Sequence, residues 1–457
     1  MFGRRSPPPL PVQRTFPTFF VIFCCLHVSE HLWEQYLKLR TRWRLQQKGI
    51  PIEVHTALGG VDEAKYSLAQ EYSAAKNSFA IVSSNIDLLQ MMLDLAIQPY
   101  VWNVVTLAVA PSMLGLTAEH EIGRMVIGSL ITLPLGLIFS LPLSAYSTFV
   151  IEEKYGFNKH TVRTWATDNL KELVVGMVLN LAMMVPLVML LRNLGDSAWL
   201  FAWAFLTVFV LLMAMLYPVW IAPLFNTFKP LRHGELREGI EHLITQSGIS
   251  CDKLFEIDGS RQSSHSNAYV TGFFGTKRIV IYDTLLSHLD HDIQVGHAWT
   301  CKHTRSTACV CMCFAVASYP ILPTQSYPHE QEVKSVVAHE IGHAVLHHNY
   351  MQLAIITTQL FATFFTYGLC QTNKYLVTDF GFDSPCTYLT LHAFFLLYNS
   401  AVSPLMGPLM NGFTRSLEFA ADRYSVHLGY DVRSALTKLS DKNLSVSASG
   451  AVTAWRH

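Results

Sequence analysis

The chain of 457 residues is 51% hydrophobic and only 14% charged, which is too apolar and too poor in charge for an ordinary soluble multidomain protein. Lys and Arg together number 33, as do Asp and Glu, so no net charge draws the chain toward nucleic acid and we expect no nucleic-acid partner. The nine cysteines lack regular spacing, which argues against a secreted disulfide framework and leaves a polytopic protein of the lipid bilayer as the expected class.

Seven apolar segments are predicted to span the membrane, because a helix needs about 20 mostly apolar residues to cross the hydrocarbon core. In chain order they cover residues 15–33, 88–109, 126–150, 173–191, 200–221, 351–370 and 388–409. The first is short and follows three arginines, so a cleaved secretory signal is the alternative. Because Ser29-Glu30-His31 offers no small-residue cleavage site, we expect this segment to be retained.

Basic residues predict the orientation of these spans. Five Lys and Arg residues between positions 38 and 48 follow the first segment, against three arginines before it, which places the N-terminus in the lumen. Counting crossings then puts residues 222–350 and the chain after 409 on the cytosolic side. We therefore divide the chain into five spans (1–225), a cytosolic segment (226–350), two spans (351–412) and a C-terminal segment (413–457). The expected fold is all-α-dominated, with one small β-hairpin predicted from the alternating and β-branched residues 272–282.

Two histidines and a glutamate interrupt the apolar helix predicted for residues 336–346. His339 and His343 lie four residues apart, and thus on one face of the helix, so their imidazoles can share one metal ion. Glu340 stands beside the first ligand and can reach a metal-bound water as a general base. The alternative is a pair of hydrogen-bonded histidines on a buried helix. His347 and His348 continue the run and are expected to be solvated or hydrogen-bonded residues at the helix end.

A third protein ligand is needed to leave one coordination position open for water. The extended metzincin pattern would have a histidine six residues after His343, but Asn349 stands there, and Leu346 replaces the expected glycine. Further along, Glu418 and Asp422 lie four residues apart on a predicted helix with Phe419, Ala420 and Ala421 between them. Glu418 is the predicted third ligand and Asp422 the predicted hydrogen-bond acceptor for a ligand histidine, a solvated acidic face being the alternative.

With these motifs the chain resembles the CAAX prenyl protease 1 family of membrane zinc endopeptidases. Besides the His-Glu-Ile-Gly-His and Glu-Phe-Ala-Ala-Asp segments, the resemblance covers Tyr-Ser-Thr-Phe-Val-Ile-Glu-Glu-Lys-Tyr-Gly-Phe-Asn at 146–158 and Ile-Ala-Pro-Leu-Phe at 221–225. It continues with Ser-Ser-His-Ser-Asn-Ala-Tyr at 263–269 and Lys-Arg-Ile-Val-Ile-Tyr-Asp-Thr-Leu-Leu at 277–286. Together these motifs extend over roughly residues 33–444, and their combination is far more specific than the histidine pattern alone.

The resemblance implies a zincin-like protease domain below seven helices that enclose a chamber, with one Zn²⁺ per chain. It also implies residence in the membrane of the endoplasmic reticulum or the inner nuclear membrane, and removal of C-terminal residues from isoprenylated CAAX proteins or peptides. Asn267, Ala268 and Tyr269 are then expected along the substrate path, where an extended peptide could pair with backbone. A purely structural turn is the alternative for Asn267.

Two stretches depart from the family pattern. Residues 294–331 form an atypical insert with four cysteines, Cys301, Cys309, Cys311 and Cys313, whose spacing is unlike that of structural zinc motifs. After Leu444 the chain lacks the Tyr-Ser-His-Pro-like segment of the family and ends at His457. We expect both stretches to lie outside the ordered catalytic fold.

Two other functions compete with the protease. A truncated, catalytically weak form could act as a membrane metal-binding or quality-control protein. A transporter or channel would need ionisable residues inside the spans; Asp94 is one of few, and the histidine and glutamate cluster has no role in such a protein.

Overall fold

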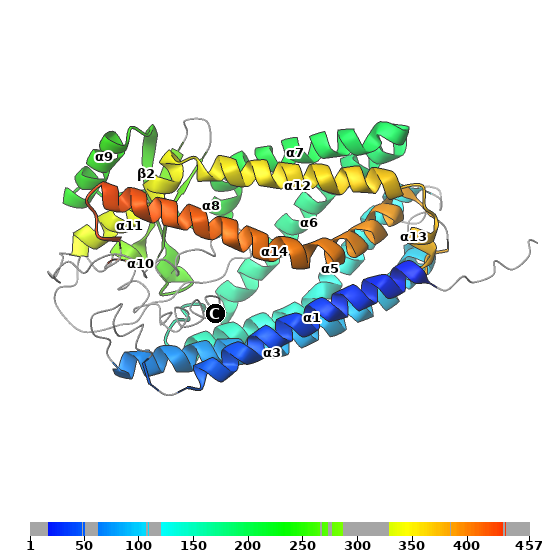
Figure 1. Cartoon of the computed structure of the whole chain (residues 1–457), viewed down its shortest axis with the longest axis horizontal. Coiled ribbons are helices and arrows are strands. Elements are labelled where there is room, and N and C mark those ends of the chain that lie inside the picture. The colour runs from blue at the N-terminus through cyan, green and yellow to red at the C-terminus, as the bar shows by residue number, and fades with distance from the viewer. Residues whose placement is uncertain are drawn as a thin grey trace, which may run out of the picture.

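The computed structural model describes residues 17–47, 49–50, 63–106, 108, 120–265, 267–272, 277–286, 329–383, 385–432 and 435. Long helices run along most of the molecule, and the strands and several short helices gather at one end (Figure 1). The long helices are α1 (Thr18–Leu45), α3 (Glu63–Tyr100), α5 (Glu121–Tyr146), α6 (Val162–Asn193), α7 (Ala198–Leu216), α12 (His348–Cys370) and α14 (Thr387–His427).

Six of the described helices are long and apolar enough to cross a membrane, namely α3, α5, α6, α7, α12 and α14. Three of them continue into π-helical turns, at Val101–Val105, Ser147–Glu152 and Tyr217–Ile221. Several of these helices extend well beyond the predicted spans: α3 begins at Glu63 rather than near residue 88, and α14 continues to His427 rather than ending near residue 409. The chain is therefore a multi-pass membrane protein, as predicted.

The first predicted span differs from the other six. It forms α1, which packs against α3 and α14 and buries Phe23 to 1% exposure. The second half of α1 carries one acidic residue, Glu34, and then four basic residues, Lys38, Arg40, Arg42 and Arg44, so the helix is not apolar enough to count among the six candidate spans. By length and composition the described residues thus supply six spans rather than seven, and a crossing by α1 stays a prediction.

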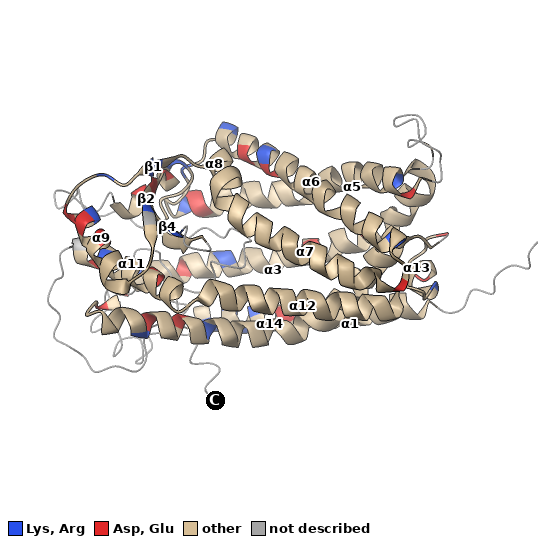
Figure 2. Ribbon diagram, turned by 90° about the horizontal axis from the view of Figure 1, so that it is seen from above, with Lys and Arg blue, Asp and Glu red and all other residues tan. Residues whose placement is uncertain are grey.

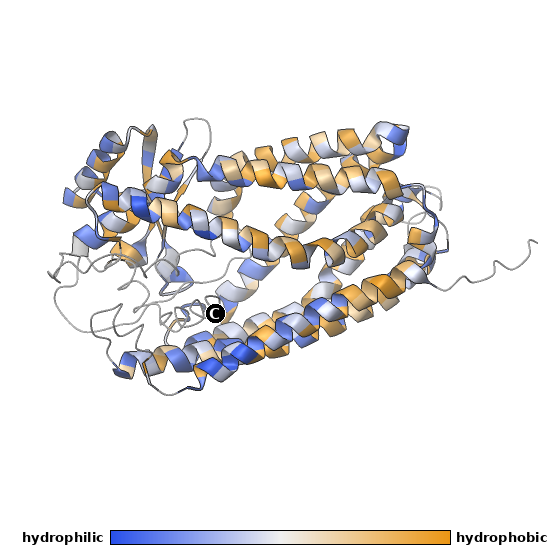
Figure 3. Cartoon of the chain, in the orientation of Figure 1, coloured by the Kyte–Doolittle hydropathy of each residue, from blue (hydrophilic) through white to orange (hydrophobic). Residues whose placement is uncertain are grey.

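Hydrophobic residues cover α7, α12 and the middle of α14 (Figure 3), whereas charged residues collect mainly at the end of the molecule that holds the strands (Figure 2). Between the helices lies a core whose largest buried side chains include Phe364, Tyr367, Leu187 and Leu389. Because hydrocarbon chains solvate apolar side chains well, exposed leucines and phenylalanines on these helices are expected of surfaces that face lipid.

A four-stranded mixed sheet forms the polar end of the molecule. Its strands β1 (Phe228–Pro230), β2 (Cys251–Ile257), β3 (Ala268–Thr271) and β4 (Lys277–Tyr282) are ordered β1-β2-β4-β3. Two antiparallel strands, β3 and β4, are present as expected, but β3 lies before the predicted range of 272–282, which contains only β4. Strand β2 adds to β4 in parallel and β1 pairs antiparallel to β2. The charged β2 and the three-residue β1 have no strong strand pattern, which is why the prediction missed them.

Four short helices lie at the sheet end of the molecule, namely α8 (Ala222–Phe225), α9 (Glu235–Ser247), α10 (Asp283–Leu286) and α11 (His329–Val345) (Figure 1). The fifth, α13 (Tyr375–Thr378), lies at the opposite end. One face of the sheet packs on α9 and α11 through a second core that contains Ile240, Leu243, Ile279, Ile281 and Ile341. Helix α11 therefore lies on a rigid platform, with its side chains held by packing.

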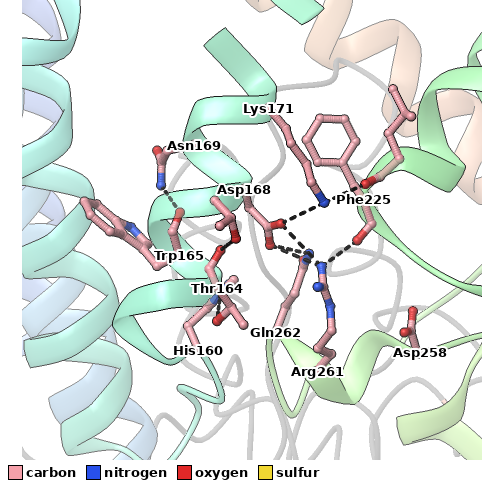
Figure 4. A network of polar contacts seen from close by, with 12 residues as sticks. His160, Thr164, Trp165, Asp168, Asn169, Lys171, Phe225, Asp258, Arg261 and Gln262 are labelled. Atoms are coloured by element: carbon pink, nitrogen blue, oxygen red, sulfur yellow. Dashed lines mark hydrogen bonds and ion pairs between the residues drawn. The ribbon is translucent and has the colours of Figure 1, made fainter. Parts of the chain in front are cut away.

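A polar network attaches the sheet end to the membrane helices (Figure 4). Asp168, in the second turn of α6, accepts hydrogen bonds at 3.2 Å from Arg261 and from Gln262, which follow β2. Arg261 also donates to the Phe225 carbonyl of α8 at 2.6 Å. Lys171, one turn further along α6, donates to the Leu224 carbonyl at 3.0 Å. Three separate segments are thus fixed to one another beside the sheet.

Helix α14 runs unbroken from the predicted seventh span into the C-terminal segment. It contains Pro404 and Pro408, which are tolerated in membrane helices because neighbouring groups satisfy the freed carbonyls. The predicted boundary between residues 412 and 413 therefore lies inside one helix, and Glu418 and Asp422 stand on the continuation of a membrane span.

Helices α11 and α14 cross in close contact beside His339 and His343. A Cβ atom added to Gly342 would stand 3.1 Å from the carbonyl oxygen and 3.2 Å from the Cα of Ala421. Nearby, the Ser425 hydroxyl donates to the Ser335 carbonyl at 3.4 Å. Backbone atoms cannot rotate away, so glycine is what allows the two helices to touch here.

We predict that Gly342→Ala lowers the melting temperature, because its methyl group forces the backbones of α11 and α14 apart. Overpacking of this kind costs about 1–3 kcal/mol, which outweighs the gain of about 1 kcal/mol that alanine brings to a helix interior. Thermal unfolding in detergent measures the shift.

Gly412→Ala is the matched control, since Gly412 also lies inside α14 and a Cβ there meets no atom within 4 Å. This variant should keep or raise the melting temperature. Equal melting temperatures for the two variants would contradict the close crossing.

Candidate metal centre

Helix α11 presents two imidazoles on one face, as the four-residue spacing predicted. The Nε2 atoms of His339 and His343 lie 3.1 Å apart. His339 is 1% exposed and His343 is half-buried. Two neutral imidazoles whose nitrogens face each other at this distance gain from a cation placed between them.

Glu418 approaches the same point from α14. Its Oε2 lies 3.3 Å from Nε2 of His339 and its Oε1 lies 3.5 Å from Nε2 of His343. The ligand atoms of these three residues all lie within 4.8 Å of one another, and among the residues that the structure describes no other group of His, Cys, Asp and Glu meets this criterion. The predicted ligand set is therefore brought together in space.

The distances are of the size that a shared ion needs. With metal–ligand bonds of about 2.0–2.1 Å, two ligand atoms in a tetrahedral site stand about 3.3 Å apart; the two histidine nitrogens are 3.1 Å apart, and each faces a different oxygen of Glu418, at 3.3 Å and 3.5 Å. If these three residues held a tetrahedral metal ion, one coordination position would stay open, as in catalytic zinc sites.

Asp422 lies behind the first histidine, as predicted. Its Oδ1 is 2.8 Å from Nδ1 of His339, one helical turn beyond Glu418 on α14. Burial lowers the pKa of His339, but the hydrogen bonds to Asp422 and Glu418 reverse the shift and raise the pKa to about 10. A metal bound at Nε2 of His339 would have to displace a proton from the ring. The proton left on Nδ1 would then face the Asp422 carboxylate and fix the ring orientation.

Glu340 lies next to His339 on α11 but does not belong to the group formed by His339, His343 and Glu418. It is partly buried, and its carboxylate accepts a hydrogen bond from the backbone N–H of Val270 in β3. Burial raises its pKa above that of an ordinary glutamate, while His339 and His343 oppose the shift. A carboxyl group with a raised pKa is suited to taking and returning a proton near neutral pH.

The hydrogen bond to Val270 shows how β3 faces the centre. Strand β3 is an edge strand, and the Asn267 carbonyl accepts from the Tyr282 N–H at 3.0 Å. In an antiparallel pair the N–H and C=O groups of every second residue bond to the partner strand. Those of Tyr269 therefore face β4, whereas those of Ala268 and Val270 face the free edge.

The three residues expected along the substrate path stand at this edge, but with different surroundings. The Asn267 Oδ1 accepts a hydrogen bond from the Ala268 N–H at 2.9 Å, which is the contact of a local turn. The Ala268 side chain is buried in the sheet core, so only its backbone can meet a ligand. Tyr269 packs edge-on against Tyr282 and lines a cavity of about 380 Å³ on the sheet face opposite α11. Their contact with substrate stays a prediction.

The two stretches that depart from the family pattern lie mostly outside the residues that the structure describes. Cys301, Cys309, Cys311 and Cys313 lie outside the described residues, as does the chain from Ser445 onward. Helix α11 begins at His329, so residues 329–331, which were assigned to the insert, belong to the first turn of the histidine helix.

Two residues of this region, Gly342 and His348, stand out only in the structure. Gly342 lies inside the histidine motif, but only the crossing with α14 shows why a side chain is absent there. The Nδ1 atom of His348 lies 2.8 Å from Nδ1 of His343, which confirms that His348 is hydrogen-bonded at the helix end and places it next to a proposed ligand.

Two family profiles match the chain. One, described as the CAAX prenyl protease N-terminal region with five membrane helices, matches residues 42–227. The other, peptidase family M48, matches residues 230–451 and thus contains β2, β3, β4, α11, α12 and α14.

Individual proteins agree with the profiles over nearly their whole length. A CAAX prenyl protease 1 homolog of Arabidopsis thaliana is 32% identical and covers 95% of this chain and 92% of its own. The homolog of Homo sapiens is 32% identical, with 91% and 87% covered. The crystal structure of S. mikatae Ste24p superposes with a TM-score of 0.77 at 28% identity, covering 94% of this chain and 93% of the other. With this fold and this cluster of histidines and acids, the chain belongs to the CAAX prenyl protease 1 family of membrane metallopeptidases in peptidase family M48.

Proposed function

We propose that this protein is a zinc-dependent endopeptidase that removes C-terminal residues from isoprenylated CAAX proteins at the membrane of the endoplasmic reticulum. The observation that carries the proposal is the convergence of His339, His343 and Glu418 on one point, with Glu340 beside it. The names of the relatives, CAAX prenyl protease 1 homologs, supply the substrate class.

The ligand types favour zinc over other metals. Two imidazoles and one carboxylate are the ligand set of many catalytic zinc sites, whereas calcium and magnesium prefer oxygen ligands alone. Zn²⁺ bound here would lower the pKa of a coordinated water and polarise the scissile carbonyl. A single group of ligands among the described residues corresponds to one ion per chain.

Separate residues of the protein then transfer the proton and hold the reacting groups in place. The Glu340 carboxylate accepts the proton of the attacking water and returns it to the leaving amine. The Val270 N–H fixes the direction of that carboxylate, and Asp422 holds the ring of His339. None of these side chains needs to move far, because α11 is packed against both the sheet and α14.

An extended peptide can add to the free edge of β3. The outward backbone groups of Ala268 and Val270 would pair with it, as in other cases of strand addition, and this places its backbone next to Glu340. The Asn267 side chain would have to leave its present turn to hold a substrate carbonyl, so the backbone is the main contact that we expect.

Delivery from the membrane follows from the course of α14. Because Glu418 stands on the continuation of a membrane helix, the ligands lie near the end of the bundle. A substrate held in the bilayer by its isoprenoid is concentrated near this end. We infer that the polar end faces the cytosol, in line with the distribution of basic residues around α1.

Glu340→Gln should retain zinc but lose cleavage of a farnesylated CAAX peptide. The amide cannot take up a proton, and general-base catalysis contributes about 10²–10⁴-fold. Turnover is measured by mass spectrometry of the released tripeptide, and zinc content by atomic absorption on the same purified protein.

His339→Ala serves as the comparison for Glu340→Gln, because it should lose both zinc and turnover. If Glu340→Gln lost its zinc with an unchanged melting temperature, Glu340 would be a ligand and the roles would be misassigned.

Glu418→Gln should weaken zinc binding by at least about tenfold, since a neutral amide is a poorer ligand than a carboxylate. The affinity is measured by competition with a chelator. Glu241→Gln provides a charge-matched control: Glu241 is exposed on α9 and pairs only with Arg237 at 2.7 Å among the contacts described. Equal chelator curves for the two variants would remove Glu418 from the ligand set.

A further inference from the structure

The chain breaks its helix directly after the proposed ligands. Helix α11 ends at Val345, His347 adopts a left-handed backbone with φ of 58°, and α12 begins at His348. His347 is the only described non-glycine residue with positive φ. Such a backbone is unfavourable for residues with a Cβ atom, so the turn is set by the packing on either side of it.

This turn decides which histidine meets His343. In a continuous helix His347, four residues on, would share the face of His343, and His348 would point elsewhere. Because the chain reverses at His347, that ring instead packs against Tyr350 with 5.7 Å between centroids. His348 comes back to His343, with 4.9 Å between ring centroids and an interplanar angle of 77°.

The contact joins the two Nδ1 atoms at 2.8 Å. His343 directs its other nitrogen, Nε2, toward His339 and Glu418. When Nε2 serves as a ligand it carries no proton, so the proton of the neutral ring is on Nδ1. Nδ1 of His343 must then donate, and Nδ1 of His348 must accept.

We propose that His348 is a positioning residue for the metal centre: its Nδ1 accepts the hydrogen bond of His343 and thereby fixes the tautomer and the ring orientation of that ligand. His348 is 2% exposed, so water does not compete for the bond. The inference rests on the proposed metal site and adds a residue to it.

The two ligand histidines thus have different supports. His339 is backed by the carboxylate of Asp422 at 2.8 Å, and His343 by a neutral ring at the same distance. A carboxylate makes an imidazole a stronger donor to a metal than a neutral acceptor does. The role of His348 is therefore one of orientation more than of charge.

Two substitutions separate the hydrogen bond from the packing. In His348→Asn the Oδ1 atom is bonded to Cγ, as Nδ1 is in histidine, so an acceptor remains in place. His348→Leu fills a similar volume without any acceptor. Loss of such a partner of a ligand histidine typically lowers metal affinity about 10–100-fold, so we expect that loss for leucine and most of the affinity back for asparagine.

The experiment measures the zinc dissociation constant of the full-length protein in detergent by chelator competition, together with the melting temperature of the metal-free form. His347→Asn is the control at the adjacent histidine and should leave the zinc affinity unchanged. Should His348→Leu fail to fold, His348→Phe replaces it as the variant that keeps ring volume without an acceptor.

The outcomes separate this inference from the proposed function. Equal affinity of the wild type and the leucine or phenylalanine variant overturns the inference alone. So does an asparagine variant that loses as much affinity as leucine, because the acceptor atom would then be irrelevant. A wild-type protein that binds no zinc overturns the proposed function and the inference with it.

Discussion

The close crossing of α11 and α14 is the constraint on which the proposed metal centre depends. Two of its proposed ligands stand on one helix and the third on another, about 75 positions further along the chain, so the carboxylate reaches the imidazoles only if the two backbones nearly touch. Gly342 leaves the space for Ala421, and Glu418 and Asp422, one turn before and directly after Ala421, then meet His339 from two sides. The same contact sets both the coordination geometry and the orientation of the buried histidine.

The rest of the fold holds these two helices in place. Helix α11 rests on the sheet through an apolar core, and the edge strand of that sheet returns a backbone N–H to Glu340. Helix α14 extends from the membrane bundle, so the packing of the spans sets the position of Glu418, the proposed third ligand. The network around Asp168 fastens the sheet end to α6 and α8 (Figure 4). A change in the tilt of a span would therefore change the positions of the residues in the proposed metal centre.

The centre also shows how one helix end can serve two purposes. The left-handed turn at His347 ends α11 and begins the span α12, and it folds His348 back onto His343. The junction between α11 and α12 therefore also holds the ring of His343, a proposed ligand. A mutation that changed the backbone at this junction would disturb the contact between His348 and His343 as well.

The sequence by itself determined the membrane class, six of the spans, the presence of a hairpin, and the spacing that brings His339, His343, Glu418 and Asp422 forward as candidate site residues. These follow from composition and from spacing within one helix or strand, because the 3.6-residue and two-residue periods state which side chains share a face. Whether the tail and the insert are ordered is a question that falls outside the described residues.

Only the tertiary structure decided the unbroken course of α14, the widening of the hairpin to four strands, the close approach at Gly342, and the contact of His343 with His348 rather than His347. The reason is physical: a period along the chain tells which residues of one element lie together, but not where that element breaks or which other element its face will meet. Those outcomes depend on packing between segments far apart in sequence, and at Gly342 and His347 it was such packing that fixed the geometry of the site.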